Sequence, residues 1–112
     1  MTSARWAAEI RKMSDAFPWF RPFENDAVAG FSGGLRCPNG KTYLVQVIAD
    51  KRTFPAIPPK IWLRPSLGTN RLGDDSLCIE RMWRPDRDTF AQQVLYAAAY
   101  IEYQRQQANC PQ

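Results

Sequence analysis

The chain has 112 residues, of which 45% are apolar and 23% charged, and this predicts one globular domain over residues 1–112. Its formal charge of +4 comes from basic residues spread along the whole sequence, so the clustered footprint of a nucleic-acid-binding protein is missing. A mildly basic surface instead favours an acidic protein partner. The lack of histidine excludes Cys-His and Ser-His-Asp catalysis and HExxH zinc sites.

The N-terminal segment lacks the apolar core of a signal peptide, and no segment approaches the roughly 18 to 20 apolar residues of a membrane span. We therefore expect a cytoplasmic protein without a membrane partner. The three cysteines, Cys37, Cys78 and Cys110, are an odd number without CxxC spacing, which argues against a disulfide framework and a metal site. At least one thiol is left free to react. Without histidine, a cysteine can still act on a substrate that arrives activated, such as a thioester.

An amphipathic helix is predicted from Ser3 to about Ala16. Its apolar residues recur at helical spacing and are Trp6, Ala7, Ile10 and Met13. The charged residues are expected on the other, exposed side, and they are Arg5, Glu9, Arg11 and Lys12. Aromatic residues and prolines at 17–22 end the helix, because proline lacks an amide donor and restrains its predecessor.

The middle of the chain predicts an antiparallel β-meander of three to four strands. Residues 26–37 have weak strand character, and the turn signal Pro38-Asn39-Gly40 separates them from residues 41–50. Within 41–50, Tyr43, Val45 and Val47 alternate with Thr42, Leu44 and Gln46, which indicates a strand with one buried face. Prolines interrupt residues 51–59, and residues 60–64 alternate again.

A long loop and a final helix complete the predicted fold. Residues 66–87 show no periodicity, and loops of this length in compact domains are usually functional. The helix begins after Asp88 or Thr89 and runs to about Gln107. Its predicted buried face comprises Phe90, Val94, Leu95, Ala98 and Ile101. The order of helix, meander, loop and helix defines an α+β fold.

Five motifs follow one another between Tyr43 and Ile101. In chain order they are Phe54-Pro55-Ala56-Ile57-Pro58-Pro59-Lys60-Ile61, Gly68-Thr69-Asn70, Ser76-Leu77-Cys78-Ile79, Trp83-Arg84-Pro85, and Thr89-Phe90 with Val94-Leu95. They resemble, respectively, the YPxxPP element, the His-Pro-Asn element, the active-site cysteine segment, the W-S-P element and the start of the crossover helix of the ubiquitin-conjugating enzyme (UBC) family. Asn70 precedes Cys78 by eight positions, which is also the interval in that family.

This resemblance implies a UBC-like fold in a minimal form. Gly68-Thr69 replaces the family's His-Pro, and the segment between Cys78 and Trp83 is shorter than usual. One helix follows the cysteine, so the last two helices of eukaryotic members are expected to be missing. Such trimming resembles bacterial members found in antiphage defence operons, alongside activating enzymes and ubiquitin-like or nucleotidyltransferase partners.

The resemblance also assigns roles to individual residues. Cys78 would carry a ubiquitin-like protein as a thioester, the alternative being a buried structural cysteine. Asn70 would stabilise the oxyanion as an amine attacks, or would be an ordinary turn asparagine. Asp74 and Asp75, with Glu80 as a third candidate, would orient the incoming amine or would be solvated turn carboxylates. Trp83 and Pro85 are interpreted mainly as packing residues.

The predicted activity is transfer of a ubiquitin-like protein, or of a nucleotidyltransferase C-terminus, from Cys78 to a target amine, with no cofactor. Arg5, Arg11 and Lys12 would dock a ubiquitin-activating-enzyme-like protein. The alternative is a non-catalytic UBC-fold module that binds the modifier or its activating enzyme. A basic nucleic-acid-binding module is a third hypothesis, for which the sequence shows no interleaved aromatic and basic residues.

Overall fold

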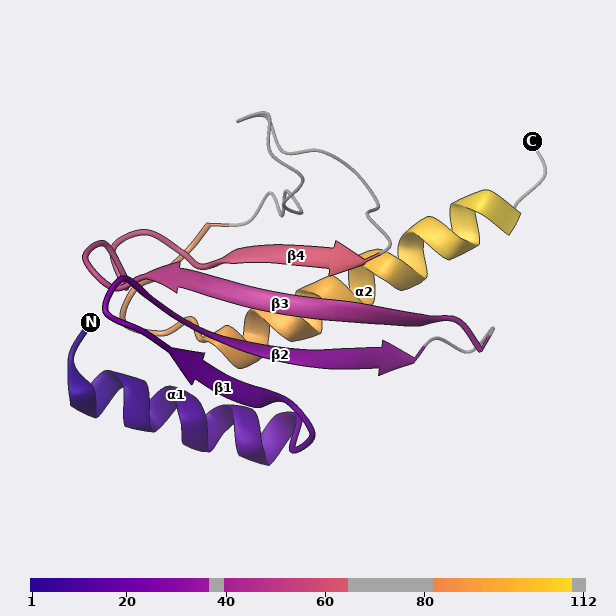
Figure 1. Ribbon diagram of the computed structural model, residues 1–112. Helices are drawn as coiled ribbons and strands as arrows, with labels where there is room; N and C mark the ends of the chain where they lie inside the picture. The colour runs from indigo at the N-terminus through magenta and orange to yellow at the C-terminus, as the bar shows by residue number, and fades with distance from the viewer. Residues whose placement is uncertain (37–39, 65–81, 110–112) are drawn as a thin grey trace.

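The computed structural model describes residues 1–36, 40–64 and 82–109, with side chains as far as residue 102. The elements are α1 (Ser3–Ala16), β1 (Arg21–Glu24), β2 (Val28–Arg36), β3 (Thr42–Asp50), β4 (Lys60–Arg64) and α2 (Phe90–Asn109). Figure 1 shows an N-terminal helix that lies beside β1 and a C-terminal helix that lies behind the sheet, and the two helices contact each other. This is the predicted α+β class, with the helices in their predicted places. No helix in the part of the chain that the structure describes has the length and apolar character to cross a membrane.

The sheet is an antiparallel meander with the strand order β1-β2-β3-β4, as the sequence predicted. β1 is the strand that was not identified on its own, because its four residues include Pro22 and follow the aromatic segment that ends α1. Proline is tolerated there because β1 lies at an edge of the sheet. Gly40, at the end of the predicted turn, has a φ of +84°, which glycine adopts without steric cost. The other residues of that turn segment, 37–39, lie outside the described ranges.

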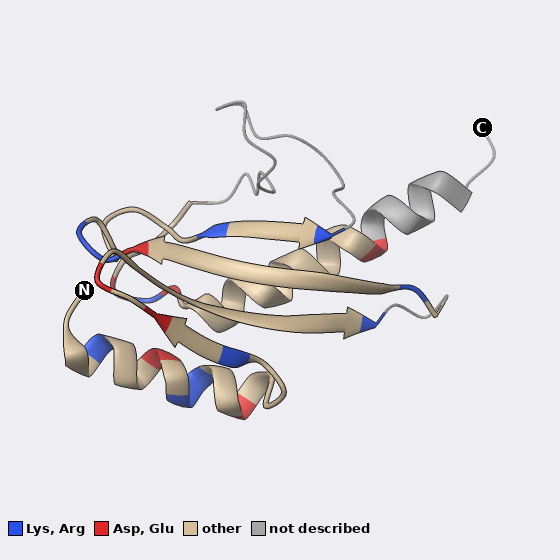
Figure 2. Ribbon diagram, viewed as in Figure 1, with Lys and Arg blue, Asp and Glu red and all other residues tan. Residues whose placement is uncertain are grey.

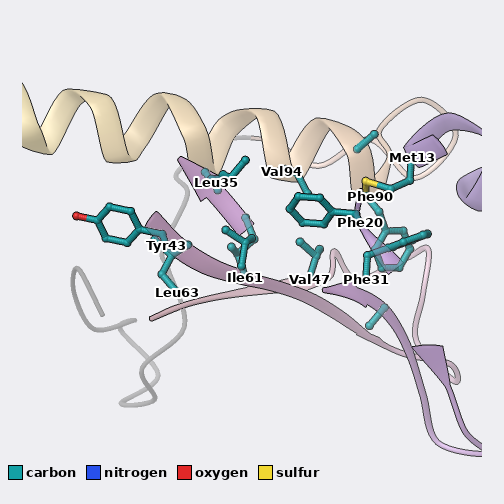
Figure 3. Close-up of a cluster of buried hydrophobic side chains, with 14 of the residues drawn as sticks. Met13, Phe20, Phe31, Leu35, Tyr43, Val47, Ile61, Leu63, Phe90 and Val94 are labelled. Carbon is teal, nitrogen blue, oxygen red and sulfur yellow. The ribbon is translucent and has the colours of Figure 1, made fainter. Parts of the chain in front are cut away.

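Strand alternation directs one face of the sheet toward the helices. In β3 the buried residues are Tyr43, Val45, Val47 and Ala49, and in β4 they are Ile61 and Leu63, which confirms the predicted alternation. α2 covers this inner face. In Figure 3, Phe90 and Val94 of α2 and the buried side chains of the strands lie between the helix and the sheet. Burial of these apolar side chains is the main source of folding free energy.

Three aromatic rings join α1, β2 and α2. The ring of Trp6 lies 5.0 Å from that of Phe31 and 5.8 Å from that of Phe90, and Phe31 and Phe90 are 5.3 Å apart. The tilted and edge-on geometries are those that aromatic quadrupoles favour. This cluster fixes α1 against the N-terminal end of α2.

The prediction that Leu95 belongs to the buried face of α2 is wrong. Leu95 is 56% exposed, whereas Phe90, Val94, Ala97 and Ile101 are buried. These four residues follow a four-three-four spacing, which is one stripe of an α-helix. Leu95 lies about 100° around the helix from Val94, so it leaves that stripe.

Gly33 and Gly34 offer a matched test of core packing. A Cβ atom at Gly33 would lie 2.5 Å from Cδ1 of Phe20, a buried ring, whereas one at Gly34 would lie 3.5 Å from its nearest neighbour, Cγ2 of Thr42. We expect Gly33→Ala to lower the free energy of unfolding by about 1–3 kcal/mol through overpacking, and Gly34→Ala to leave it nearly unchanged. Urea denaturation followed by circular dichroism measures both, and equal stability of the two variants would show that Phe20 does not restrict this position.

Candidate functional site

The predicted catalytic residues fall outside the described ranges. Cys78, Asn70, Asp74 and Asp75, together with Glu80, all lie within 65–81, and Cys37 and Cys110 are also outside. The structure describes the segments on either side of the predicted active-site loop, namely β4 with the preceding proline-rich turn, and the chain from Met82 into α2. These two segments border the candidate site.

Two of the motifs that border the loop are in contact. The indole Nε1 of Trp83 donates a hydrogen bond to the carbonyl oxygen of Pro55 at 2.6 Å. The rings of Trp83 and Phe54 are 5.9 Å apart, and Phe54 also lies 4.9 Å from Phe90 in the core. Trp83 is thus a packing residue, as predicted. The proline-rich segment and the Trp83-Arg84-Pro85 segment therefore contact each other and together form the border of the predicted active-site loop. Ile57, in the proline-rich segment, is 56% exposed.

Arg5 is the residue that ties this border to α1. Its guanidinium donates to the carbonyl oxygens of Pro85 at 2.6 Å and Asp88 at 2.8 Å, and its Cζ lies 5.1 Å from the ring centroid of Phe54. Its Nε also donates to Oε1 of Glu9 at 2.9 Å. The prediction that Arg5 lies on the exposed side of the helix is wrong, because four neighbouring groups hold its side chain, which is 22% exposed.

Glu9 occupies a buried position that the sequence interpretation placed on the exposed side of α1. Its side chain is 1% exposed, and Oε2 accepts the backbone N–H of Phe90, the first residue of α2, at 2.9 Å. A carboxylate at this point is stabilised by an otherwise unpaired amide and by the positive end of the helix dipole. The signal was available, since Glu9 lies three residues after Trp6 and four before Met13, within the apolar stripe.

A capping box completes the start of α2. The hydroxyl of Thr89 accepts the N–H of Gln92 at 3.1 Å, and the side-chain carbonyl of Gln92 accepts the N–H of Thr89 at 3.0 Å. Of the two predicted caps, Thr89 fills the role. Asp88 instead accepts the N–H of Arg84 at 2.7 Å and closes the preceding turn.

A surface hollow of about 350 Å³ lies beside this turn. Its lining includes Met82, Arg84, Arg87, Asp88, Gln92 and Tyr96. The guanidinium groups and the carboxylate of this lining can bind polar or charged groups. Among the residues that the structure describes, no cluster of three or more Cys, Asp or Glu side chains could hold a metal ion.

Arg11 and Lys12 are exposed on α1, as predicted. Their role in docking an activating-enzyme-like protein stays a prediction.

The chain was compared with protein-family models, with curated proteins and with solved structures, and none of these comparisons gave a match.

Proposed function

We propose that this protein is a ubiquitin-conjugating-enzyme-like transferase, with a UBC-like fold and Cys78 as its thioester carrier. The observation that carries the proposal is the contact between Trp83 and the Phe54-Pro55 pair. It joins two motifs, 28 residues apart, that the resemblance to the family assigns to the borders of one active site. The order of helix, four-stranded meander and helix is also the order that this resemblance implies.

The chemistry proceeds in two acyl transfers. The thiolate of Cys78 attacks the thioester carbonyl on the cysteine of an activating enzyme; a new carbon–sulfur bond forms, the old one breaks, and that cysteine leaves as the thiolate. A target amine then attacks the carbonyl carbon of the Cys78 thioester. An amide bond forms, the carbon–sulfur bond breaks, and the released Cys78 thiolate takes up the proton that the amine loses. A thiolate is a good leaving group, so neither step requires histidine. We place this activity in the cytoplasm and in bacterial antiphage defence, with a ubiquitin-like protein or a nucleotidyltransferase C-terminus as the acyl group.

The contacts of Arg5 support the proposal because they fix the border of the loop. The same guanidinium binds the turn at Pro85 and Asp88 and lies against Phe54, so α1, the proline-rich segment and the start of α2 hold one geometry. An acyl-transfer site depends on such positioning, because small misplacements of reacting groups lower the rate strongly. A charging assay with activating enzyme, ATP and modifier tests the proposal, and a conjugate that thiol reductant removes is the expected product.

The exposed cations of α1 give a prediction about the activating enzyme. The double variant Arg11→Glu with Lys12→Glu is expected to slow charging about 5- to 10-fold at low salt, because reversed charge weakens electrostatic steering. The effect should shrink as salt is raised. For the single variant Arg11→Glu, the matched control for charge reversal is Arg52→Glu, since Arg52 is 91% exposed and lies outside the helix, in the segment between β3 and β4. Unchanged charging of the double variant at low salt would contradict this docking surface.

Asn70 gives a prediction that separates the two chemical steps. Asn70→Ala should be charged normally but should discharge onto free lysine roughly 100-fold more slowly, because a lost oxyanion donor costs ~3 kcal/mol. The control is Asn25→Ala, since the Oδ1 of Asn25 accepts the N–H groups of Ala27 at 2.8 Å and Val28 at 2.9 Å in a turn. Equal discharge by the two variants would assign Asn70 to a turn as well. Single-turnover discharge on non-reducing gels measures the rates.

A further inference from the structure

Arg5 differs from the other two basic residues that the sequence assigned to docking. Figure 2 shows basic and acidic segments alternating along α1, and in sequence order these are Arg5, Glu9, Arg11 with Lys12, and Asp15. Arg11 and Lys12 are exposed and can meet a partner, whereas the Arg5 side chain is 22% exposed and is held by contacts within the chain. These contacts indicate a role other than docking.

Each nitrogen of the Arg5 guanidinium donates to a different acceptor. Nε donates to Oε1 of Glu9 at 2.9 Å, and the two terminal nitrogens donate to the carbonyl oxygens of Pro85 at 2.6 Å and Asp88 at 2.8 Å. The planar group also lies over the ring of Phe54. A lysine ammonium has one nitrogen and no plane, so it cannot make the same set of contacts.

Glu9 orients this guanidinium. Its carboxylate is 1% exposed and connects Nε of Arg5 with the backbone N–H of Phe90, with 2.9 Å on each side. Because one carboxylate oxygen is fixed on the first residue of α2, the other oxygen fixes the guanidinium relative to α2. Arg5 and Glu9, which we call the clamp, therefore fasten α1 to the start of α2 and to the turn before it.

The segment that the clamp holds connects the predicted active-site loop to α2. It comprises residues 82–89 and begins four residues after Cys78 in the sequence. Near its start, Trp83 donates to the carbonyl oxygen of Pro55 at 2.6 Å, and further along Arg5 binds two of its carbonyl oxygens. Because these acceptors are main-chain atoms, the clamp determines the path of the backbone where it leaves the loop.

We propose that Arg5 is a positioning residue of the transferase, oriented by Glu9, and that it acts on the chemical steps at Cys78 and not on docking of the activating enzyme. This inference rests on the proposed function. Arg5 acts through the backbone of residues 82–89 and supplies no atom to the reaction. Its effect on rate follows from the steep dependence of acyl transfer on the relative placement of the reacting groups.

Discharge of the preformed Cys78 thioester onto free lysine, after the activating enzyme and ATP have been removed, isolates the second chemical step. Arg5→Lys should lower this discharge rate roughly 10-fold, because it keeps the charge but loses the planar set of donors. Arg11→Glu with Lys12→Glu should discharge at the parent rate. In charging titrated with activating enzyme, Arg5→Lys should lower the maximal rate without changing KM, whereas the double variant should raise KM.

Two further measurements separate positioning from a loss of stability. Gly33→Ala is the stability control, because it is expected to strain the core around Phe20, and it should discharge as the parent chain does while circular dichroism shows it folded. Hydrogen exchange gives a readout that does not depend on activity. Arg5→Lys should raise amide exchange within residues 82–90 and leave that of β3 unchanged.

The outcomes distinguish this inference from the proposed function. If the parent chain forms no thioester on Cys78, the proposed function fails, and the inference fails with it. If the parent chain is charged but Arg5→Lys discharges at the parent rate, or exchanges no faster within residues 82–90, the inference alone is overturned. An equal loss of discharge in Gly33→Ala would also overturn it, because stability would then account for the effect. A raised KM as the sole defect of Arg5→Lys would return Arg5 to docking.

Discussion

Replacing Glu9 with alanine is expected to lower the free energy of unfolding by about 3 kcal/mol. The side chain of Glu9 is 1% exposed and accepts hydrogen bonds from the backbone of Phe90 and from Arg5. Its removal leaves the Phe90 amide without its acceptor and opens a small void. Nε of Arg5 also loses its acceptor, but the Arg5 side chain is 22% exposed and keeps its hydrogen bonds to Pro85 and Asp88. Most of the expected loss comes from the buried amide rather than from the ion pair.

Urea denaturation followed by circular dichroism measures this loss. Asp15→Ala is the matched control, because Asp15 is an exposed carboxylate in the same helix, and its variant should lie within about 0.5 kcal/mol of the parent chain. Glu9→Gln keeps an acceptor for the Phe90 amide and should recover part of the stability. If Glu9→Ala is as stable as Asp15→Ala, the carboxylate does not hold α1 against α2.

Replacing Cys78 with alanine is expected to abolish charging, because no other group is assigned to form the thioester. Cys78→Ser should instead form an oxyester, which resists thiol reductant, whereas the conjugate of the parent chain should be removed by it. Cys37→Ala and Cys110→Ala are the matched controls and should be charged as the parent chain is. Charging is read on non-reducing and reducing gels. Loss of charging in either control variant, with its circular dichroism spectrum unchanged, would mean that a different thiol carries the modifier.

The meander and its helices were predictable because their signals are local. β3 alternates Tyr43, Val45 and Val47 with outward-facing residues over nine positions, and prolines and glycines mark where strands stop. β1 was not identified because four residues with a proline give a weak strand signal. Its extended conformation depends on pairing with β2, which the local sequence does not reveal. Leu95 was misassigned because consecutive apolar residues in a helix do not reveal which of them lies on the core side.

The borders of the candidate site were predicted only in part. Trp83 was assigned to packing from its chemistry, but its acceptor at Pro55 is 28 residues away in the sequence. Arg5 and Glu9 were interpreted as solvent-facing charges, whereas their partners at Asp88 and Phe90 lie 83 and 81 residues away. Charged side chains are usually exposed, and only the tertiary structure shows which of them are enclosed and paired.

The most direct test of the transferase proposal is the position of the modifier on the charged protein. The chain is incubated with its activating enzyme, ATP and modifier, quenched without reductant at low pH, digested, and examined by mass spectrometry. The proposal predicts that the modifier's C-terminal residue is attached to the peptide that contains Cys78, and that thiol treatment before digestion removes it. Attachment to Cys37, Cys110 or a lysine, or the absence of any thiol-sensitive conjugate, would contradict the proposed mechanism.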